Sequence, residues 1–227
     1  KNACNLGMRL FMMLPPRKIK FTFIDPVKLG DSFAIFRNLV SSDDRSSEVI
    51  NGKIWSDPSD IENKLRTMTG HISDVNQGCL RGKYPNIYEY NKNAAQNAEA
   101  YQILMLMDFP AGFSEQSLRI LEQIVASGPK CGVFTIIYRS KSQYDKVSER
   151  MHPLISNIEN NFQEFTFSED SNTITCSGEK VKDKPLIWSS LPLPNTIQLN
   201  EIMGKLKDGI KNADKVVIGI DEMKKVA

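Results

Sequence analysis

The stretch Tyr101-Gln-Ile-Leu-Met-Leu-Met-Asp108-Phe109-Pro110 decides the fold of this chain of 227 residues. Its apolar run, residues 103–107, is too short to span a membrane and too continuous for a strand with one solvent-exposed face. The run therefore predicts a strand buried on both faces of a sheet. Asp108 follows at the carboxyl end of that strand, where ligands bind in open parallel α/β sheets. Asp108 is the first candidate site residue.

A helix and then another strand follow this central strand. Ser114 is a predicted N-cap, and the apolar stripe after it, Leu118, Leu121, Ile124 and Val125, predicts a helix that ends at Gly128-Pro129. Residues 131–137 predict another buried strand, which ends at Tyr138-Arg139. Strand, helix and strand with short connections predict a right-handed βαβ unit, and therefore a parallel sheet.

The region before the central strand predicts a third strand and two helices. Residues 18–25 alternate apolar and polar side chains and end at Asp25-Pro26, so a second acid stands at the carboxyl end of a strand. Residues 5–14 predict the end of a helix that Pro15-Pro16 stops. A capping box, Ser59 with Glu62, and a long apolar stripe predict a helix over residues 60–80, and residues 86–91 predict a linker.

The carboxyl-terminal third is less regular. It predicts a helix over residues 146–160, a hairpin about residues 169–172, a helix over 200–212 and a strand at 216–218. The fold class is therefore α/β: a mostly parallel sheet flanked by helices, with a small α+β carboxyl-terminal extension. We assign residues 1–140 to the core and residues 141–227 to the extension, which we expect to complete the same domain.

Composition excludes few classes of protein. The chain has 29 basic and 27 acidic residues, so its net charge of +2 does not indicate nucleic-acid binding. It has no run of 18 apolar residues and no signal-peptide pattern, which predicts a cytoplasmic protein without a membrane segment. The first residue is Lys1, and the chain stops shortly after a strand-like run, so we expect a fragment of a longer polypeptide.

Cysteine and histidine do not form a metal-binding pattern. Cys4, Cys79, Cys131 and Cys176 lack C-x-x-C spacing and predict free thiols. His71 lies in the predicted helix 60–80 without a second ligand at i+4, which indicates a partly buried or surface residue rather than a metal ligand.

With these elements placed, the chain resembles the FtsK/SpoIIIE-type ATPase domain, a RecA-like P-loop fold of hexameric DNA translocases. Three stretches carry the resemblance in the expected order: residues 21–28 with Asp25, the Walker-B-like strand ending at Asp108, and residues 131–139, where the family has a strand ending in a polar sensor. The chain is most similar to the divergent, ATPase-like half of large coiled-coil FtsK/SpoIIIE-domain proteins. The resemblance implies ATP and Mg²⁺ as cofactors, with weak or absent binding in this fragment. It also implies an active ATPase domain in the same parent chain as a partner, and further a hexamer and DNA.

The chain departs from the P-loop pattern. The motif G-x-x-x-x-G-K-[ST], whose amides and lysine hold the phosphates, does not occur. Gly52-Lys53 is followed by Ile54 and lacks the first glycine of the motif, so it predicts an ordinary loop, although residues 48–55 also favour a short strand. The family's spacing places the phosphate loop at or before Lys1, where Asn2 stands at the position of the required Ser or Thr.

The residue after Asp108 is a second departure. The family has a glutamate there that orients the attacking water, and this chain has Phe109, which cannot accept a proton. Two interpretations of Asp108 are open: a remnant of the magnesium site, shared with Asp25, or a cap that binds nearby backbone amides. Arg139 is either a sensor or arginine finger, or an ordinary surface arginine.

Basic residues follow Arg139, but acids are interspersed among them. The acids Asp145, Glu149, Glu179 and Asp183 favour a solvated surface over a DNA contact; the basic residues are Lys141, Lys146, Arg150, Lys180, Lys182 and Lys184.

Three hypotheses of function follow. The first is a non-catalytic, degenerate ATPase-like module that acts in assembly, regulation or DNA engagement. The second is a genuine ATP-binding motor domain whose P-loop lies upstream of this chain. The third is an unrelated phosphate-binding α/β protein, which would lack the central Walker-B strand and bind its ligand at a glycine-rich turn near Gly30 or Ala111-Gly112.

Overall fold

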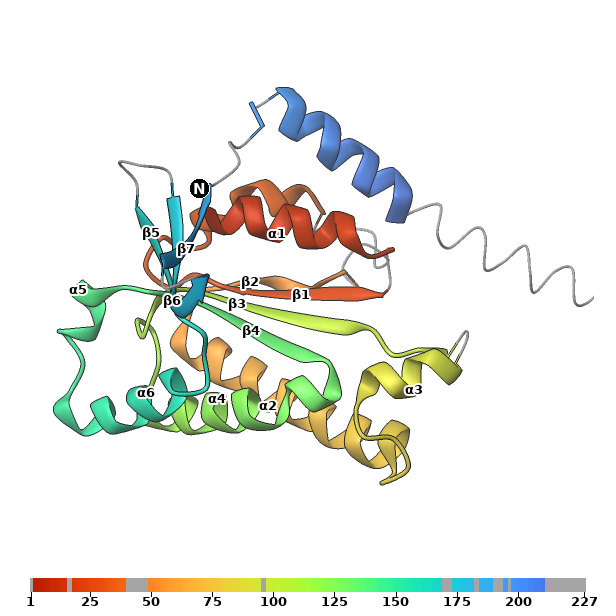
Figure 1. Ribbon diagram of the computed structural model, residues 1–227, viewed down its shortest axis with the longest axis horizontal. Coiled ribbons are helices and arrows are strands. Elements are labelled where there is room, and N and C mark those ends of the chain that lie inside the picture. The colour runs from red at the N-terminus through yellow and green to blue at the C-terminus, as the bar shows by residue number, and fades with distance from the viewer. Residues whose placement is uncertain are drawn as a thin grey trace, which may run out of the picture.

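The computed structural model describes residues 2–15, 18–39, 49–94, 97–168, 173–181, 184–189, 194–195 and 197–210. Figure 1 shows a layered molecule in which helices cover both faces of a central sheet. The strands of that sheet are β1 (Ile19–Ile24), β2 (Ile50–Trp55), β3 (Tyr101–Phe109) and β4 (Val133–Arg139). The helices around it are α1 (Asn2–Met13), η1 (Asp31–Leu39), α2 (Pro58–Asp74), η3 (Val75–Leu80), α3 (Ile87–Ala94), α4 (Glu115–Ser127), η5 (Pro129–Cys131), α5 (Lys141–Tyr144), η6 (Glu149–Met151) and α6 (His152–Glu159).

The central sheet is parallel, as the βαβ pattern predicts. Its strand order is β2-β1-β3-β4, and all three strand pairings are parallel. The predicted central strand β3 lies between β1 and β4, and its residues 102–106 are buried. This internal position contradicts the third hypothesis, which requires a sheet without a central strand of this kind.

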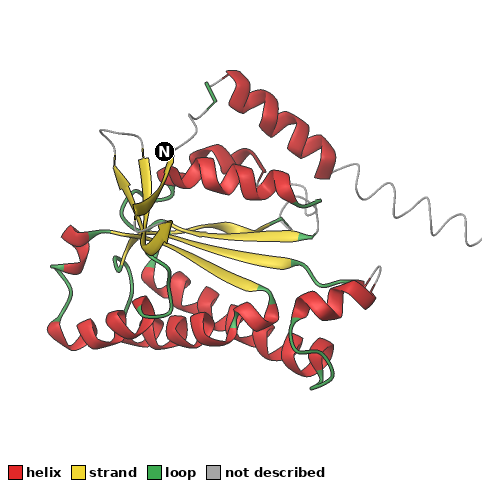
Figure 2. Cartoon of the chain, in the orientation of Figure 1, coloured by secondary structure: helices red, strands yellow, loops and turns green. Residues whose placement is uncertain are grey.

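Two apolar cores fill the space on the two faces of the sheet. Figure 2 shows α1 and the helix at residues 197–210 on one side of the sheet. The core under these helices and η1 contains stacked phenylalanines. Phe23 is central to that stack, with ring centroids 4.4 Å from Phe33 and 4.8 Å from Phe36. The other core lies under α2, α4 and α6. Apolar side chains of β3 enter both cores in alternation, which explains the continuous apolar run.

Helix α2 forms where the apolar stripe predicts it, but its cap differs from the predicted capping box. The N-cap is Asp57, whose carboxylate accepts hydrogen bonds from the backbone N–H groups of Ser59 and Asp60. Pro58 occupies the first turn, where its missing N–H costs nothing. Glu62 does not close a capping box; it pairs with Arg66 instead. The last turn of the predicted helix is the π-helical η3.

One further sequence prediction needs correction. Helix α3 occupies the region predicted as a linker; Asn86 caps it by accepting a hydrogen bond from the N–H of Glu89. Helix α4 ends at Ser127 with Gly128 as its C-cap, as predicted, although Gly128 itself is right-handed, with φ −58°. The left-handed residue is Gly132, with φ 82°, after the short η5 turn. Pro129 has no N–H to continue the α-helical hydrogen bonds of α4, and the chain passes through η5 before it turns at Gly132.

Strand β4 is less buried than its apolar sequence predicts. Val133 is buried, but Phe134 and Arg139 are exposed and the residues between them are half-buried. The reason is position, because β4 is an edge strand among the strands that the structure describes. A continuous apolar run therefore predicts a strand, but it does not predict whether that strand has neighbours on both sides.

A small antiparallel sheet follows the core, as predicted. It consists of β5 (Phe165–Ser168), β6 (Thr173–Val181) and β7 (Lys184–Ser189), in the order β5-β6-β7. The last helix spans residues 197–210 and begins before the predicted residue 200. The predicted turn at 169–172 and strand at 216–218 lie outside the described residues. In the described part, no helix is long and apolar enough to cross a bilayer.

Candidate functional site

The carboxyl edge of the central sheet brings the predicted site residues together. Ile24 of β1 is in register with Leu106 of β3, so Asp25 and Asp108 end adjacent strands at one edge. Arg139 of β4 is in register with Phe109 of β3. Four positions chosen from sequence therefore lie on three neighbouring strands at the same edge.

The first turn of α1 also lies at this edge. The Cys4 thiol donates a hydrogen bond of 2.7 Å to the carbonyl oxygen of Ser32, in the segment that follows Asp25. Burial raises the pKa of Cys4, and burial together with the nearby Cys4 raises the pKa of Tyr138 to about 12. Neither Cys4 nor Tyr138 was predicted, because no sequence pattern joins a residue of α1 to one of β4.

Asp25 is fully buried and both of its carboxylate oxygens bind backbone. Oδ2 accepts a hydrogen bond of 2.9 Å from the N–H of Ser32, and Oδ1 accepts one of 3.3 Å from the N–H of Lys28. These bonds hold the turn that leads from β1 into η1. Asp25 is thus engaged as a cap on its own loop.

Asp108 has an unusual backbone and an unpaired side chain. Its φ is 52°, in the left-handed region, and the register between β3 and β4 shifts between Leu106 and Phe109, so β3 bulges at Asp108. Its Oδ2 atom is buried and has no hydrogen-bond partner among the described residues. The interpretation of Asp108 as a side-chain cap is therefore wrong, because its carboxylate accepts no hydrogen bond from the described backbone. The backbone carbonyl of Asp108 accepts a 3.0 Å hydrogen bond from the N–H of Ala111 instead.

Replacing Asp108 with glycine is expected to stabilise the protein. Glycine adopts a positive φ without strain, and the change also removes a buried carboxylate oxygen that lacks a partner. We expect a gain of about 1 kcal/mol in the free energy of unfolding, measured by urea denaturation. Asp108→Ala is the matched control, because alanine keeps the backbone strain; an equal gain in both variants would show that the backbone is not strained.

Phe109 turns away from the edge and into the core. Its side chain is fully buried in the core under α2 and α4, and its ring lies 5.3 Å from that of Phe113 in an edge-to-face contact. The bulge at Asp108 causes this, since strict alternation from Leu106 would place residue 109 on the opposite face. The carbonyl of Phe109 accepts a 2.9 Å hydrogen bond from the N–H of Ser140 and joins the ends of β3 and β4.

Arg139 is half-exposed and already has partners. Its Nε lies 3.0 Å from Oε1 of Glu159 on α6, and its guanidinium lies 5.1 Å from the centre of the Tyr144 ring. Oε1 of Glu159 has no partner with hydrogen-bond geometry, so the contact with Arg139 is ionic. The structure thus joins Arg139 to α5 and α6, and no local sequence pattern predicts these contacts.

The stability of the protein is expected to depend on the charge of Glu159. Burial raises the pKa of its carboxyl, Arg139 lowers it, and Glu164 raises it. The folded state therefore holds this proton at higher pH than the unfolded state, whose pKa is near 4.5. This contribution makes the free energy of unfolding rise as the pH falls from above the raised pKa towards 4.5.

Glu159→Gln is expected to remove that part of the pH dependence, because glutamine does not titrate. Urea denaturation at several pH values between 4.5 and 7 would measure it, with Glu149→Gln, an exposed position on η6, as the control. The same pH dependence in Glu159→Gln and in the unmodified protein would contradict the assignment.

The glycine-rich candidates do not form phosphate loops. Gly52-Lys53 lies within strand β2, which corrects the predicted loop, and Lys53 pairs with Asp60 at 2.6 Å. A Cβ at Gly112 would lie 2.7 Å from Pro26, and one at Gly30 would lie 3.1 Å from Ile54. Both glycines therefore allow close packing of their turns against these side chains.

Other sequence predictions concern metal ligands and the basic segment. Cys4, Cys79 and Cys131 are free thiols, and no group of three metal-ligating side chains occurs in the described ranges. His71 is half-buried, as predicted. Lys141, Lys146 and Arg150 are exposed, as a solvated surface requires.

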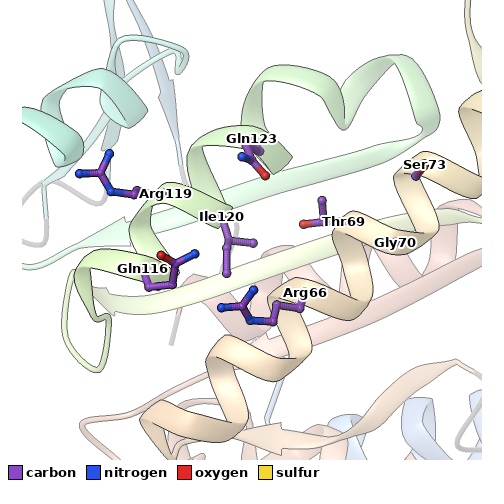
Figure 3. Close-up of a pocket in the computed structure, with 8 residues that line it drawn as sticks. All are labelled: Arg66, Thr69, Gly70, Ser73, Gln116, Arg119, Ile120 and Gln123. Carbon is purple, nitrogen blue, oxygen red and sulfur yellow. The ribbon is translucent and has the colours of Figure 1, made fainter.

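A shallow groove of about 460 Å³ lies elsewhere, between α2 and α4 (Figure 3). Arg66 and Gln116 face one another across it. Arg66 pairs with Glu62 and Arg119 pairs with Glu115, each four residues earlier on its own helix. None of the predicted site residues lines the groove, and we assign it no role.

The described residues fit a magnesium nucleotide poorly. The unpaired oxygen of Asp108 suits a cation, but the oxygens of Asp25 already bind backbone amides. The sequence has no phosphate-binding lysine motif, and Phe109 offers no carboxylate. We therefore derive no chemical step through a nucleotide at this edge.

No known family model matches the sequence, and no curated protein sequence matches it. Solved structures do match its fold. The chain is similar to EssC (ATPases 2 and 3) from Geobacillus thermodenitrificans, with 15% identity and a TM-score of 0.58, over 96% of this chain and 42% of that chain. It is also similar to the cytoplasmic domain of the type VII secretion ATPase EccC of Thermomonospora curvata, with 13% identity and a TM-score of 0.59, over 88% of this chain and 25% of that one.

A third similar structure is the conjugation coupling protein TcpA of pCW3, a monomer form with ATPγS, with 11% identity and a TM-score of 0.52. The match covers 88% of this chain and 59% of TcpA. The chain thus spans less than two thirds of each of these proteins. At this level of identity the likeness concerns the fold, and it agrees with the parallel sheet and its central strand β3. This chain therefore has the RecA-like α/β fold of FtsK/SpoIIIE-type P-loop ATPase domains.

Proposed function

We propose that this chain is a catalytically degenerate ATPase-like module of an FtsK/SpoIIIE-type protein. In this proposal it acts in assembly, regulation or DNA engagement beside an active ATPase domain of the same parent chain. A hexameric arrangement, DNA as a further partner and a cytoplasmic location belong to the same proposal.

The position of Phe109 carries this proposal. A hydrolytic ATPase of this type needs a carboxylate after the Walker-B aspartate to orient water. Here that position has an apolar ring inside the core, in contact with Phe113. The side chain lacks the required chemistry and also lies outside the edge where a substrate would bind.

Two further observations support a structural role for the edge. The carboxylate of Asp25 caps a loop, and Arg139 is paired with Glu159. A residue that already holds the fold has less freedom to bind a changing ligand. The edge is thus better suited to maintaining shape than to turning over a nucleotide.

One observation favours the second hypothesis, a genuine ATP-binding motor domain. The buried, unpaired Oδ2 of Asp108 has the chemistry of a magnesium-organising aspartate. That hypothesis requires a phosphate loop from residues upstream of Lys1.

Calorimetry with ATP and Mg²⁺, together with an ATPase assay, tests the proposal. We expect this chain to show no hydrolysis above background. Hydrolysis that Asp108→Ala abolishes would refute the proposal. The same titration on a chain extended upstream in the parent sequence separates the two hypotheses: binding without hydrolysis supports a degenerate nucleotide sensor, and binding with hydrolysis supports a motor domain.

A further inference from the structure

The sheet face that packs against α2 changes character along its length. Ile24 of β1 and Leu104 and Leu106 of β3 belong to the apolar core on this face. Towards the amino ends of the strands, the same alternation presents Lys20 and Gln102, which are in register with each other. Strands of a parallel sheet covered by helices are normally apolar on both faces, so polar side chains here require an explanation.

A hydrogen-bonded floor joins three strands at this polar end. The amide Nδ2 of Asn51 on β2 donates to Oγ1 of Thr22 at 2.9 Å and to Oε1 of Gln102 at 3.4 Å. Thr22 is fully buried, and Gln102 is 8% exposed. Buried polar groups that are paired in this way hold their positions, so the floor is preorganised.

Two lysines beside this floor lack negative partners. Lys64 of α2 is half-buried, with Nζ 5.6 Å from the centre of the Trp55 ring, and Lys20 is also half-buried. Burial lowers the pKa of Lys64, and the positive charge of Lys20 lowers it further. Within the described residues neither ammonium group has an ion pair or a hydrogen bond. Lys53, over the same ring at 5.1 Å, differs because it pairs with Asp60.

Two acids near this end of the sheet, Glu99 and Asp74, influence the pKa of His71. Burial lowers the pKa of His71; Glu99 and Asp74 raise it, and Lys20 lowers it. Nε2 of His71 is buried without a partner in the described part of the chain. Among the described residues, Lys20 and Lys64 thus have no anionic partner at this polar end, and a half-buried charge without one is costly unless an anion binds there.

We propose that Lys20 and Lys64 bind an oxyanion of the phosphate class above the floor formed by Thr22, Asn51 and Gln102. Two ammonium groups balance a group that carries nearly two negative charges at neutral pH, and lysine binds phosphate as a point charge. The ligand is recognised by its phosphate group. This site is separate from the carboxyl edge, because Lys20 lies near the start of β1 and Asp25 follows its end.

Titration with inorganic phosphate at constant ionic strength, with chloride as the replaced anion, tests this site. We expect saturable changes in the NMR signals of the Trp55 indole N–H and of the backbone around Lys64. Lys64→Gln and Lys20→Gln are each expected to weaken binding about tenfold or more. Lys130→Gln, at an exposed position between α4 and β4, is the matched control and is expected to bind as the unmodified protein does.

A measurement of thermal stability distinguishes a variant that has lost phosphate binding from one that has failed to fold. Without phosphate, Lys64→Gln is expected to raise the melting temperature, because it removes a half-buried charge without a partner; phosphate is then expected to stabilise the unmodified protein and not this variant. Absence of saturation, equal binding in the Lys64→Gln variant, or an equal response to acetate would each overturn the proposal. An equal response to acetate would indicate a carboxylate-bearing partner.

Discussion

Phe109→Glu is expected to unfold the protein rather than to create a hydrolytic site. The sequence suggests the change, because it restores an acid after Asp108 at the position where the family has one. The structure predicts the opposite result, since the Phe109 side chain is fully buried against Phe113 in an apolar core. A carboxylate there has no partner, and the ring contacts are lost as well.

The expected loss exceeds about 4 kcal/mol, most of the stability of an ordinary domain. Circular dichroism and urea denaturation would measure it. Tyr88→Glu, an aromatic position on α3 that is 57% exposed, is the control and is expected to change stability by about 0.5 kcal/mol or less. A folded Phe109→Glu protein with ATPase activity would show that residue 109 faces the edge, and it would refute the proposed function as well.

Asp25→Ala is expected to cost about 3 kcal/mol of folding free energy. The change leaves the N–H groups of Lys28 and Ser32 without their buried carboxylate acceptor, and hydrogen bonds to charged groups are worth about 1.5–3 kcal/mol each. Asp25→Asn retains one acceptor oxygen, so we expect an intermediate loss. Thermal and urea denaturation of both variants would give the values.

Asp31→Ala provides the comparison for Asp25. Asp31 lies in the same turn, but its side chain is 74% exposed and only pairs with Arg37 on the surface, so the expected loss is below about 1 kcal/mol. If Asp25→Ala is as stable as Asp31→Ala, then Asp25 does not hold the loop, and its burial requires another explanation, such as a ligand.

Local patterns predicted the elements whose signal lies within one segment. The apolar run before Asp108 became the central strand β3, and Ser114 caps α4 by accepting a hydrogen bond from the N–H of Ser117. Predictions failed where two local signals competed. Asp57 and Ser59 both had the chemistry of an N-cap, and Asp57 prevailed because Pro58 suits the first helical position.

The sequence by itself determined the parallel α/β architecture, the place of Asp25 and Asp108 at one edge, and the absence of a phosphate-loop motif. These follow from burial periodicity and residue chemistry, which each segment carries alone. Only the tertiary structure decided that β3 bulges at Asp108, that Phe109 enters the core, and that Arg139 pairs with Glu159. Each of these depends on the register or packing of segments that are distant in the chain. The local sequence pattern of one segment does not show which distant segment it will contact.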